Sequence, residues 1–519
     1  MASWRSPETW RARVLALCTL MVSGCALPVV QQKAEHTLVA DHITAETRLG
    51  RAWHPKRLAH PGLSGIHPLA DARDAFVARI LLAEAAETTL DVQYYIWHSD
   101  ITGTLLLESL LAAADRGVRV RLLLDDNGIR GLDETLSALA DHPNIHIRLF
   151  NPFVVRSPKW LGYITDFSRL HRRMHNKSFT ADNQATIIGG RNIGDEYFGA
   201  TDGLLFSDLD VLAAGPVVNE VSTDFDKYWN SRFSYPVHTL LPAVTTDAAE
   251  ILRQLRQRQD AASARQYLNA LENSGLLEQV VTGNLSLLWA PTRMISDPPN
   301  KIADKAPEKA MLRHQLRKAI GEPERSLTLI SPYFVPTAEG LEYFQELARQ
   351  GVRVRILTNS LEATDVVAVH SGYARYRKPL IKAGVELFEM RKLGSEPTEP
   401  HESAGPFGSS GSSLHAKTFV VDYNDIFIGS FNFDPRSMNL NTELGFIIES
   451  EELAATMEDV ISSLLPSSSY RVRLDSRNRL YWVEQNSGGK TIHSKEPHTS
   501  ASRRAGAFLM SLLPLEPLL

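Results

Sequence analysis

The sequence predicts an α/β protein that consists of two homologous domains. The first observation is a strand–helix–strand unit that occurs twice, at Thr89–Asp125 and at Leu327–Thr358. In each unit a glycine, Gly117 or Gly351, follows the expected helix, and a Val-Arg-Val-Arg run then alternates with the period of a strand. A crossover of this length implies that the two strands pair in parallel. The glycines lie 351 − 117 = 234 residues apart, and so long a period indicates two domains, not a solenoid.

The second observation is the composition, which is that of a globular protein. The chain has 519 residues, of which 43% are hydrophobic and 22% charged, and this excludes disordered, collagen-like and coiled-coil classes. No apolar run reaches about 18 residues, which excludes a polytopic membrane protein. The formal net charge of -5 argues against a dedicated nucleic-acid binder, which usually carries a basic surplus. Only two cysteines occur, Cys18 and Cys25, so the folded body has no disulfide framework or cysteine-based zinc site.

Residues 1–24 are typical of a secretory signal peptide. Several arginines precede a short apolar core at Val14–Val22, which is too short to remain as a membrane-spanning helix. The run ends in Val-Ser-Gly-Cys25, which resembles the lipobox of bacterial lipoproteins, where the cysteine is acylated. We therefore expect a lipoprotein anchored through Cys25 and facing the periplasm of a Gram-negative bacterium, at the outer or the inner membrane. An ordinary cleaved signal is the alternative.

The other segments follow in order along the chain. We expect an N-terminal segment at 25–65, a first α/β domain at 66–245, a helical linker at 246–285, a second α/β domain at 286–468 and a C-terminal hairpin and tail at 469–519. The linker is rich in Ala, Gln, Arg and Leu and predicts helices at Ala248–Gln257 and Ala261–Glu272. A Gly/Ser-rich stretch at 394–413 predicts a surface loop. Alternating runs at Tyr470–Leu474 and Arg479–Val483 predict a small hairpin.

The third observation is a pair of matching motifs, one in each half. Each motif has a histidine, a lysine two residues later, an aspartate five residues after that, and a Gly-x-x-Asn run after six more residues. The members are His175, Lys177, Asp182, Gly189 and Asn192 in the first motif and His415, Lys417, Asp422, Gly429 and Asn432 in the second. Turn-forming residues lie at Asp182-Asn183 and at Asp422–Asp425, and an apolar strand follows each turn, so each motif predicts a hairpin. A histidine and a lysine two apart on a strand project from the same face.

This pattern resembles the phospholipase D superfamily, whose signature H-x-K-x4-D-x6-G-S-x-N is present twice. The resemblance covers about residues 66–468, and stretches such as Asp91–Trp97, Leu161–Phe167 and Leu512–Glu516 look closest to bacterial cardiolipin synthases of the C type. It implies two phospholipase D-like α/β sandwich domains, related by a pseudo-twofold axis, with the active site at their interface. Gly190 departs from the signature, which has serine there, so we expect inequivalent halves and not a loss of activity.

The resemblance also implies a division of labour. One histidine attacks phosphorus and forms a phosphohistidine, while the other protonates the departing alcohol and then deprotonates the incoming one. Lysines and asparagines hold the non-bridging oxygens. The catalytic candidates are His175, Lys177, Asp182, His415, Lys417 and Asp422, the substrate-binding candidates are Asn192, Asn432 and Ser430, and the histidine-orienting candidates are Asp208 and Glu443. We interpret the two motif aspartates as turn-stabilising more than catalytic. Which histidine is the nucleophile stays open, although the resemblance favours His175. No metal or cofactor is expected.

Several functions are compatible with these residues. The leading one is a phosphatidyltransferase that makes cardiolipin by transesterification between phospholipids, with phosphatidylglycerol as acceptor and either this lipid or phosphatidylethanolamine as donor. A phospholipase D that releases phosphatidic acid would use the same residues. The acidic balance argues against a nucleic-acid phosphodiesterase and against a nucleic-acid partner, and two intact motifs argue against a non-catalytic lipid-binding scaffold. The expected partners are phospholipids and a membrane surface. The aromatic cluster around Trp160 and Tyr163 is core or pocket wall, or a rim that dips into a bilayer.

Overall fold

The computed structural model describes residues 27–28, 41–200, 205–259, 261–272, 274–276, 279, 285–392, 412–486 and 489–519. The expected signal peptide, the expected lipidation site Cys25 and most of the Gly/Ser-rich loop lie outside these residues. In the described part of the chain, no helix is long and apolar enough to cross a membrane.

The first half forms a nine-stranded mixed sheet. In sheet order the strands are β10 (Leu288–Ala290), β1 (Ser64–Leu69), β8 (Asp210–Ala214), β6 (Ala185–Gly189), β5 (Ser178–Ala181), β2 (Thr89–Ile96), β3 (Arg119–Gly128), β4 (Ile145–Phe150) and β9 (Ser234–Pro236). Strands β2, β3 and β4 pair in parallel and the remaining neighbours are antiparallel. The predicted first strand–helix–strand unit is confirmed as β2, α5 (Ile101–Asp115) and β3.

The second half repeats this order in a ten-stranded sheet. Its strands are β11 (Thr292–Ser296), β18 (Leu444–Glu449), β17 (Asp425–Gly429), β16 (Thr418–Val421), β12 (Ser326–Ile330), β13 (Arg353–Asn359), β14 (Glu386–Met390), β19 (Ser469–Leu474), β20 (Leu480–Asn486) and β21 (Gly489–His493). The second predicted unit is confirmed as β12, α15 (Thr337–Arg349) and β13. The predicted hairpin in the tail is confirmed as β19 and β20, which extend this sheet.

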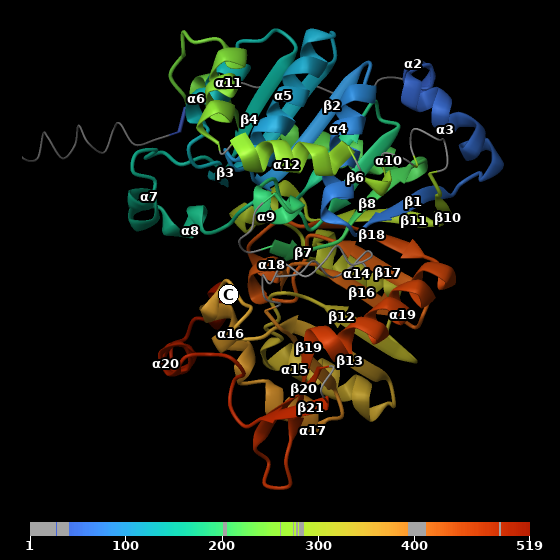
Figure 1. The fold of residues 1–519 in the computed structure, drawn as a ribbon, viewed down its shortest axis with the longest axis vertical. Coiled ribbons are helices and arrows are strands. Elements are labelled where there is room, and N and C mark those ends of the chain that lie inside the picture. Colours follow the sequence, from blue (N-terminus) through green and yellow to red (C-terminus); the bar gives the residue numbers. More distant parts are fainter. Residues whose placement is uncertain are drawn as a thin grey trace, which may run out of the picture.

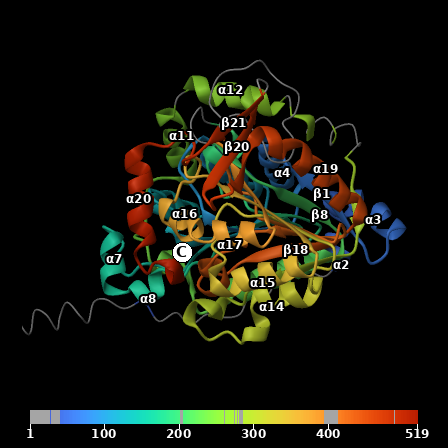
Figure 2. The same cartoon turned by 90° about the horizontal axis from the view of Figure 1, so that it is seen from below.

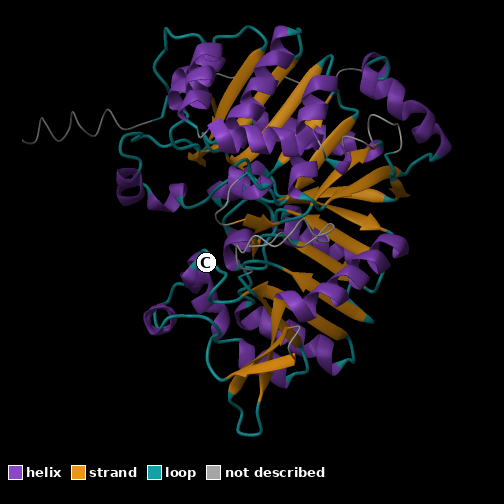
Figure 3. Cartoon of the chain, in the orientation of Figure 1, coloured by secondary structure: helices purple, strands orange, loops and turns teal. Residues whose placement is uncertain are grey.

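Helices cover both sheets, as Figure 3 shows with the strands of the first sheet in the upper half and those of the second in the lower half. In the first half the longer helices are α3 (Arg48–Ala59), α4 (Ala72–Ala85), α6 (Asp133–Leu139), α10 (Pro216–Trp229), α11 (Ala248–Arg258) and α12 (Ala261–Glu272). In the second half they are α14 (Leu312–Ile320), α16 (Val367–Ala374), α17 (Arg377–Lys382), α19 (Glu451–Ser468) and α20 (Ala501–Ser511). The predicted linker helices are confirmed as α11 and α12. They contribute Leu252 and Tyr267 to the core of the first half and so are packed parts of it.

A shared apolar core joins the two halves. Side chains of α10, such as Val217 and Val221, belong to the same buried cluster as Ile428 of β17 and Met457 of α19. The segment from β10 to β11 passes directly from one sheet to the other, and β7 (Leu205–Ser207) pairs in parallel with β15 (Ser412–Leu414) of the opposite half. The two motif hairpins are therefore held in one fixed relation (Figure 1).

Candidate active site

Each motif forms the expected hairpin. The histidine and lysine lie just before the first strand, β5 or β16, which pairs with β6 or β17. The two residues at each hairpin tip have positive φ angles: 51° and 51° at Asp182 and Asn183, and 53° and 60° at Asp422 and Tyr423. Two consecutive positive φ values define the turn that suits a two-residue hairpin, and aspartate and asparagine tolerate this conformation better than most residues. Local turn chemistry therefore places the imidazole and the ammonium at the opposite end of the hairpin from the tip.

The motif aspartates hold the chain near the tips of the hairpins. Asp182 accepts hydrogen bonds from the backbone N–H groups of Glu87, Thr88 and Thr89, just before and at the start of β2. Asp422 accepts three such bonds from residues 324–326, at the start of β12. These bonds favour the interpretation of the aspartates as structural, and we therefore move both residues out of the catalytic group.

Each histidine is oriented by a carboxylate of the opposite half. His175 Nδ1 lies 2.8 Å from Glu443 Oε2, and His415 Nδ1 lies 2.5 Å from Asp208 Oδ2. The backbones follow the same exchange, because His175 N donates to the carbonyl of Thr442 (2.9 Å) and His415 N donates to the carbonyl of Ser207 (2.7 Å). A carboxylate on Nδ1 fixes the proton there and leaves the lone pair on Nε2. The two imidazoles thus share one site at the interface, and each half completes the other.

The two lysines lie beside the imidazoles and are fully buried. Lys177 Nζ donates to the carbonyl of His175 (2.6 Å), and Lys417 Nζ donates to the carbonyl of His415. Burial is the main cause that lowers the pKa of Lys177 to about 7 and that of Lys417 to about 8, and the ammonium of Lys417 contributes to the shift of Lys177. Burial and the nearby lysines also lower the pKa of both histidines, that of His175 most strongly. An anionic ligand at the site would oppose these shifts, because it favours the charged forms of the lysines and histidines.

The two orienting acids differ in charge. Burial raises the pKa of Glu443 to about 7. Asp208 is equally buried, but His415, Lys417 and Arg191 outweigh that burial and hold its pKa below the ordinary value. The Asp208 carboxylate is therefore ionised at neutral pH and stabilises a protonated His415, whereas Glu443 does so less for His175.

The half with Gly190 in place of the signature serine is also the half whose orienting acid is the shorter one, Asp208. A Cβ atom at residue 190 would lie 2.1 Å from Asp208 Oδ1 and 2.7 Å from Oδ2, so the carboxylate occupies the space of the signature serine. In the other half, Ser430 Oγ donates to Glu443 Oε2 (2.5 Å) and accepts from Leu444 N (3.1 Å). Ser430 is thus engaged in holding the acid, and we move it from the substrate-binding to the histidine-orienting group. The halves are inequivalent, as expected.

The two motif asparagines also differ. Asn192 Oδ1 accepts from Ile96 N (3.2 Å) and its Nδ2 donates to the Tyr197 hydroxyl (3.0 Å), so this amide supports the site wall. The buried Oδ1 of Asn432 has no hydrogen-bond partner among the described residues, which leaves it available to a ligand. An amide oxygen accepts hydrogen bonds, so this atom suits a hydroxyl group of a ligand and not a phosphoryl oxygen. The expectation that both amides hold the non-bridging oxygens stays a prediction.

Sequence reasoning missed two tyrosines and a buried ion pair. Tyr95 and Tyr197 pack edge-on against His175 and His415, with ring centroids 5.1 and 5.3 Å apart. Tyr95 ends a predicted strand, where α/β sites often lie, and this position is the one signal that could have identified it.

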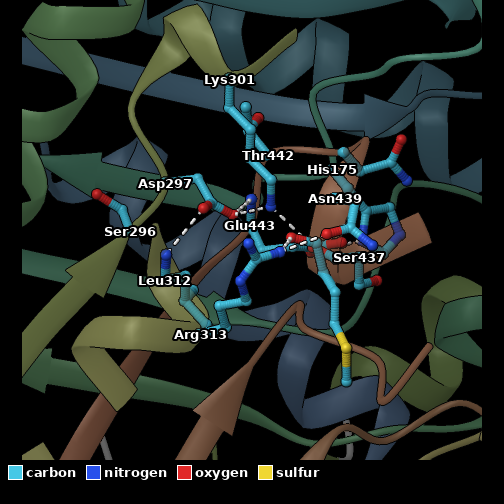
Figure 4. A network of polar contacts seen from close by, with 12 residues as sticks. His175, Ser296, Asp297, Lys301, Leu312, Arg313, Ser437, Asn439, Thr442 and Glu443 are labelled. Atoms are coloured by element: carbon cyan, nitrogen blue, oxygen red, sulfur yellow. Dashed lines mark hydrogen bonds and ion pairs between the residues drawn. The ribbon is translucent and has the colours of Figure 1, made fainter. Parts of the chain in front are cut away.

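The ion pair lies behind Glu443. Lys301 Nζ donates to Asp297 Oδ2 (2.8 Å) and to the carbonyl of Ser437 (2.8 Å). Asp297 Oδ2 also accepts from Glu443 N (3.1 Å), and Asp297 N donates to the Glu443 carbonyl (2.9 Å). Figure 4 shows Glu443 between Asp297 and His175. This pair braces the acid. No sequence motif marks it, because the pairing of β11 with β18, which are far apart in the sequence, brings residues 297–301 beside Glu443.

Comparisons with known proteins match both halves of the chain. A family model described as "Cardiolipin synthase, PLD-like domain" matches residues 80–229 and again residues 316–465. Cardiolipin synthase C of Escherichia coli (strain K12) is 49% identical over 472 residues, which are 91% of this chain and 100% of that protein. Cardiolipin synthase B of Shigella flexneri is 23% identical over 75% of this chain and 78% of its own length. The crystal structure of phosphatidylserine synthase from Haemophilus influenzae Rd KW20 covers 91% of this chain and all of that chain, with a TM-score of 0.55 and 13% identity, and shows likeness of fold.

Proposed function

Since the chain belongs to the family of cardiolipin synthases with PLD-like domains, we propose that it is a phosphatidyltransferase that makes cardiolipin from two phospholipids through a phosphohistidine. The observation that carries the mechanism is the exchanged pairing of two imidazoles with two carboxylates across the interface. The substrates are phospholipids, with phosphatidylglycerol as acceptor and phosphatidylglycerol or phosphatidylethanolamine as donor. Two buried ammonium groups supply the positive charge that this phosphoryl chemistry needs, so no metal is required.

In the first step, Nε2 of His175 attacks the phosphorus of the donor. A P–N bond forms, the P–O bond to the departing alcohol breaks, and this alcohol takes its proton from Nε2 of His415. In the second step, His415 takes the proton of the acceptor hydroxyl, whose oxygen attacks phosphorus while the P–N bond breaks. One phosphodiester is consumed and one is formed, so the reaction needs no nucleotide.

The roles of the two histidines follow from the inequivalent acids. A nucleophile must be neutral, and the pKa of His175 lies well below the ordinary value because the ring is buried beside Lys177. A general acid must carry a proton, and the ionised Asp208 together with the phosphodiester anion favours imidazolium at His415. These differences support nucleophilic attack by His175.

The product mixture tests the proposal. Purified full-length protein is incubated with vesicles of isotope-labelled phosphatidylglycerol, and the lipids are read by mass spectrometry. Cardiolipin and free glycerol are expected in equal amounts. Phosphatidic acid without cardiolipin would make the protein a hydrolase, and labelled phosphatidylethanolamine in a parallel reaction identifies the donor.

We also propose the finer location. Acylation of Cys25, with residues 1–24 as the signal peptide, would tether the enzyme to a membrane on the periplasmic side, where both lipids are met without nucleotide energy. The boundaries 66–245 and 286–468 remain our proposal for the two catalytic domains, with residues 25–65, 246–285 and 469–519 as the N-terminal, linker and C-terminal segments.

The pH dependence of kcat/KM, which reports on the free enzyme, should differ from that of kcat, which reports on the enzyme with bound substrate. Anion binding needs both ammonium groups, so kcat/KM on a soluble phosphodiester is expected to fall as the pH rises through about 7 to 8, where Lys177 and Lys417 lose their protons in the empty site. The bound anion favours the charged lysines and raises their pKa, so the alkaline limb of kcat should lie at higher pH. Lys177→Arg, whose charge does not titrate, should move the limb of kcat/KM upward even where the rate is lower. Coincident limbs for kcat and kcat/KM would contradict this account.

A further inference from the structure

Large apolar side chains that are exposed gather in two segments far apart in the sequence. Of the fifteen such side chains among the described residues, ten lie in these segments. They are Trp160, Leu161, Ile164 and Phe167 in the first segment and Phe508, Leu509, Met510, Leu512, Leu513 and Leu518 in the second. Trp160 and Ile164 are 61% and 71% exposed, so the interpretation of this cluster as core is wrong for these side chains.

The two segments lie on the same side of the molecule. Helices α7 (Trp160–Thr165) and α8 (Phe167–Leu170) project from the first half, and α20 projects from the second, on the left of both Figure 1 and Figure 2. Arg436 ties them together: its guanidinium donates to the carbonyl of His171 at the end of α8 (2.8 Å) and to that of Leu518 (3.1 Å). We call the exposed apolar side chains of residues 160–167 and 508–518 the apolar face.

The apolar face adjoins the active site through a short chain of contacts. The hydroxyl of Tyr163, on α7, donates to Asn127 Oδ1 (2.8 Å), and Asn127 Nδ2 donates to the hydroxyl of Tyr95 (3.3 Å). Tyr95 packs against the ring of His175. A hydrophobic surface on α7 is therefore three side chains away from the proposed nucleophile.

The charges around the apolar face suit a phospholipid surface. Its two segments contain two carboxylate side chains, and both are paired: Asp166 with Arg169 (2.6 Å) and Glu516 with Arg375 (3.5 Å). Neither therefore leaves an uncompensated negative charge to repel anionic headgroups. Tryptophan and tyrosine at the edge of such a surface are typical of the membrane–water interface.

We propose that the apolar face docks on the surface of a phospholipid bilayer, so that lipids reach the active site from beside α7 and α20. The proposal rests on the proposed function in one respect, that phospholipids are the substrates. The two segments enter the lipid side by side. One segment belongs to each half, so the docking surface extends across the interface at which the histidines lie. Exposed apolar area of this kind binds a membrane reversibly and without a spanning helix.

The test measures vesicle binding apart from catalysis. All variants are full-length and carry Cys25→Ser, so that an acyl anchor cannot mask the effect, and His175→Ala prevents turnover of the lipid. The test variant is Trp160→Ser with Ile164→Ser, Phe508→Ser and Leu512→Ser. The control, with two substitutions, is Ile43→Ser with Leu58→Ser, which removes exposed apolar side chains from α2 (Asp41–Thr44) and α3 on the other side of the molecule.

The vesicles contain phosphatidylglycerol and phosphatidylethanolamine, and binding is read by co-sedimentation. Each large apolar side chain moved into lipid is worth roughly a tenfold change in partitioning, so the test variant should lose binding by at least about 100-fold while the control binds like its parent. With His175 present, the test variant should still hydrolyse soluble bis(4-nitrophenyl) phosphate at the parent rate.

Three results would overturn the docking proposal: unchanged vesicle binding, an equal loss on the soluble substrate, or the loss of a dimer in sedimentation velocity, which would make a second copy the occupant of the face. Vesicle binding by a protein without any phosphodiesterase activity would instead refute the proposed function and leave the docking surface standing.

Discussion

Replacing His175 with alanine is expected to lower turnover of every substrate by about 10⁴-fold or more, because it removes the proposed nucleophile that forms the covalent bond to phosphorus. Replacing His415 with alanine should lower phospholipid turnover by about 10² to 10⁴-fold, because a poor leaving alcohol then departs without a proton. The measurement is the initial rate of cardiolipin formation, followed by mass spectrometry.

A second substrate separates the two roles. 4-Nitrophenol leaves without protonation, so a phosphatidyl 4-nitrophenyl diester should restore the first half of the reaction in His415→Ala, with one burst of nitrophenol and a trapped phosphoenzyme. The same diester should not help His175→Ala. A burst in His175→Ala and none in His415→Ala would reverse the assignment, and near-normal rates in both would remove the two-histidine mechanism altogether.

Folding is the control for both variants. Removal of His415 leaves the ionised and buried Asp208 with one partner fewer, which costs stability in addition to chemistry. His415→Asn keeps a donor for this carboxylate and should unfold closer to the temperature of the parent while remaining as slow as His415→Ala on phospholipid. His142→Ala removes a histidine that pairs with Asp115 away from the site and should change neither property.

Local patterns allowed the hairpins to be predicted from the sequence, because a histidine, a lysine and a turn-forming pair lie within nine residues. Asp208 and Glu443 were also predicted to orient the histidines. Their exchange between the halves could not be read from the sequence, since it depends on how the two sheets pack. The bracing pair of Asp297 and Lys301 was missed because it depends on the pairing of β11 with β18, which are far apart in the sequence. The direction of the Asp182 and Asp422 side chains was equally invisible, because a motif does not show that the hairpin tip meets the start of the neighbouring strand.

The departure from the family signature at Gly190 was predicted to make the halves unequal, but its physical reason appears only in the structure. From sequence comparison alone, glycine at this position means only that the hydroxyl group of the signature serine is missing. The structure shows that the carboxylate of Asp208 occupies the place of that side chain. The aspartate side chain is one methylene shorter than that of Glu443, the acid in the other half. Gly190 with Asp208, and Ser430 with Glu443, are therefore two solutions to the same task of holding an acid against an imidazole.

Restoring the signature serine at residue 190 is therefore expected to damage the enzyme. The new Cβ would lie 2.1 Å from Asp208 Oδ1, well inside the distance at which atoms repel, so the carboxylate must leave Nδ1 of His415. A shift of about 1 Å at a catalytic group can cost about 100-fold in rate, and Gly190→Ser should lose at least that much in kcat on both lipid and soluble diester. The measurement is the rate together with the unfolding temperature.

Two further variants decide whether the Cβ or the hydroxyl is responsible. Gly190→Ala adds the same Cβ without the hydroxyl and should lose as much activity as Gly190→Ser. In the opposite half, Ser430→Gly removes a hydroxyl that donates to Glu443 while that acid keeps its contact with His175, so a loss of only about tenfold is expected from one hydrogen bond. If the kcat of Gly190→Ser matched or exceeded that of the parent, the glycine would not be needed to leave space for Asp208, and its only effect would be the loss of a hydroxyl group. The inequivalence of the two histidines would then need another cause.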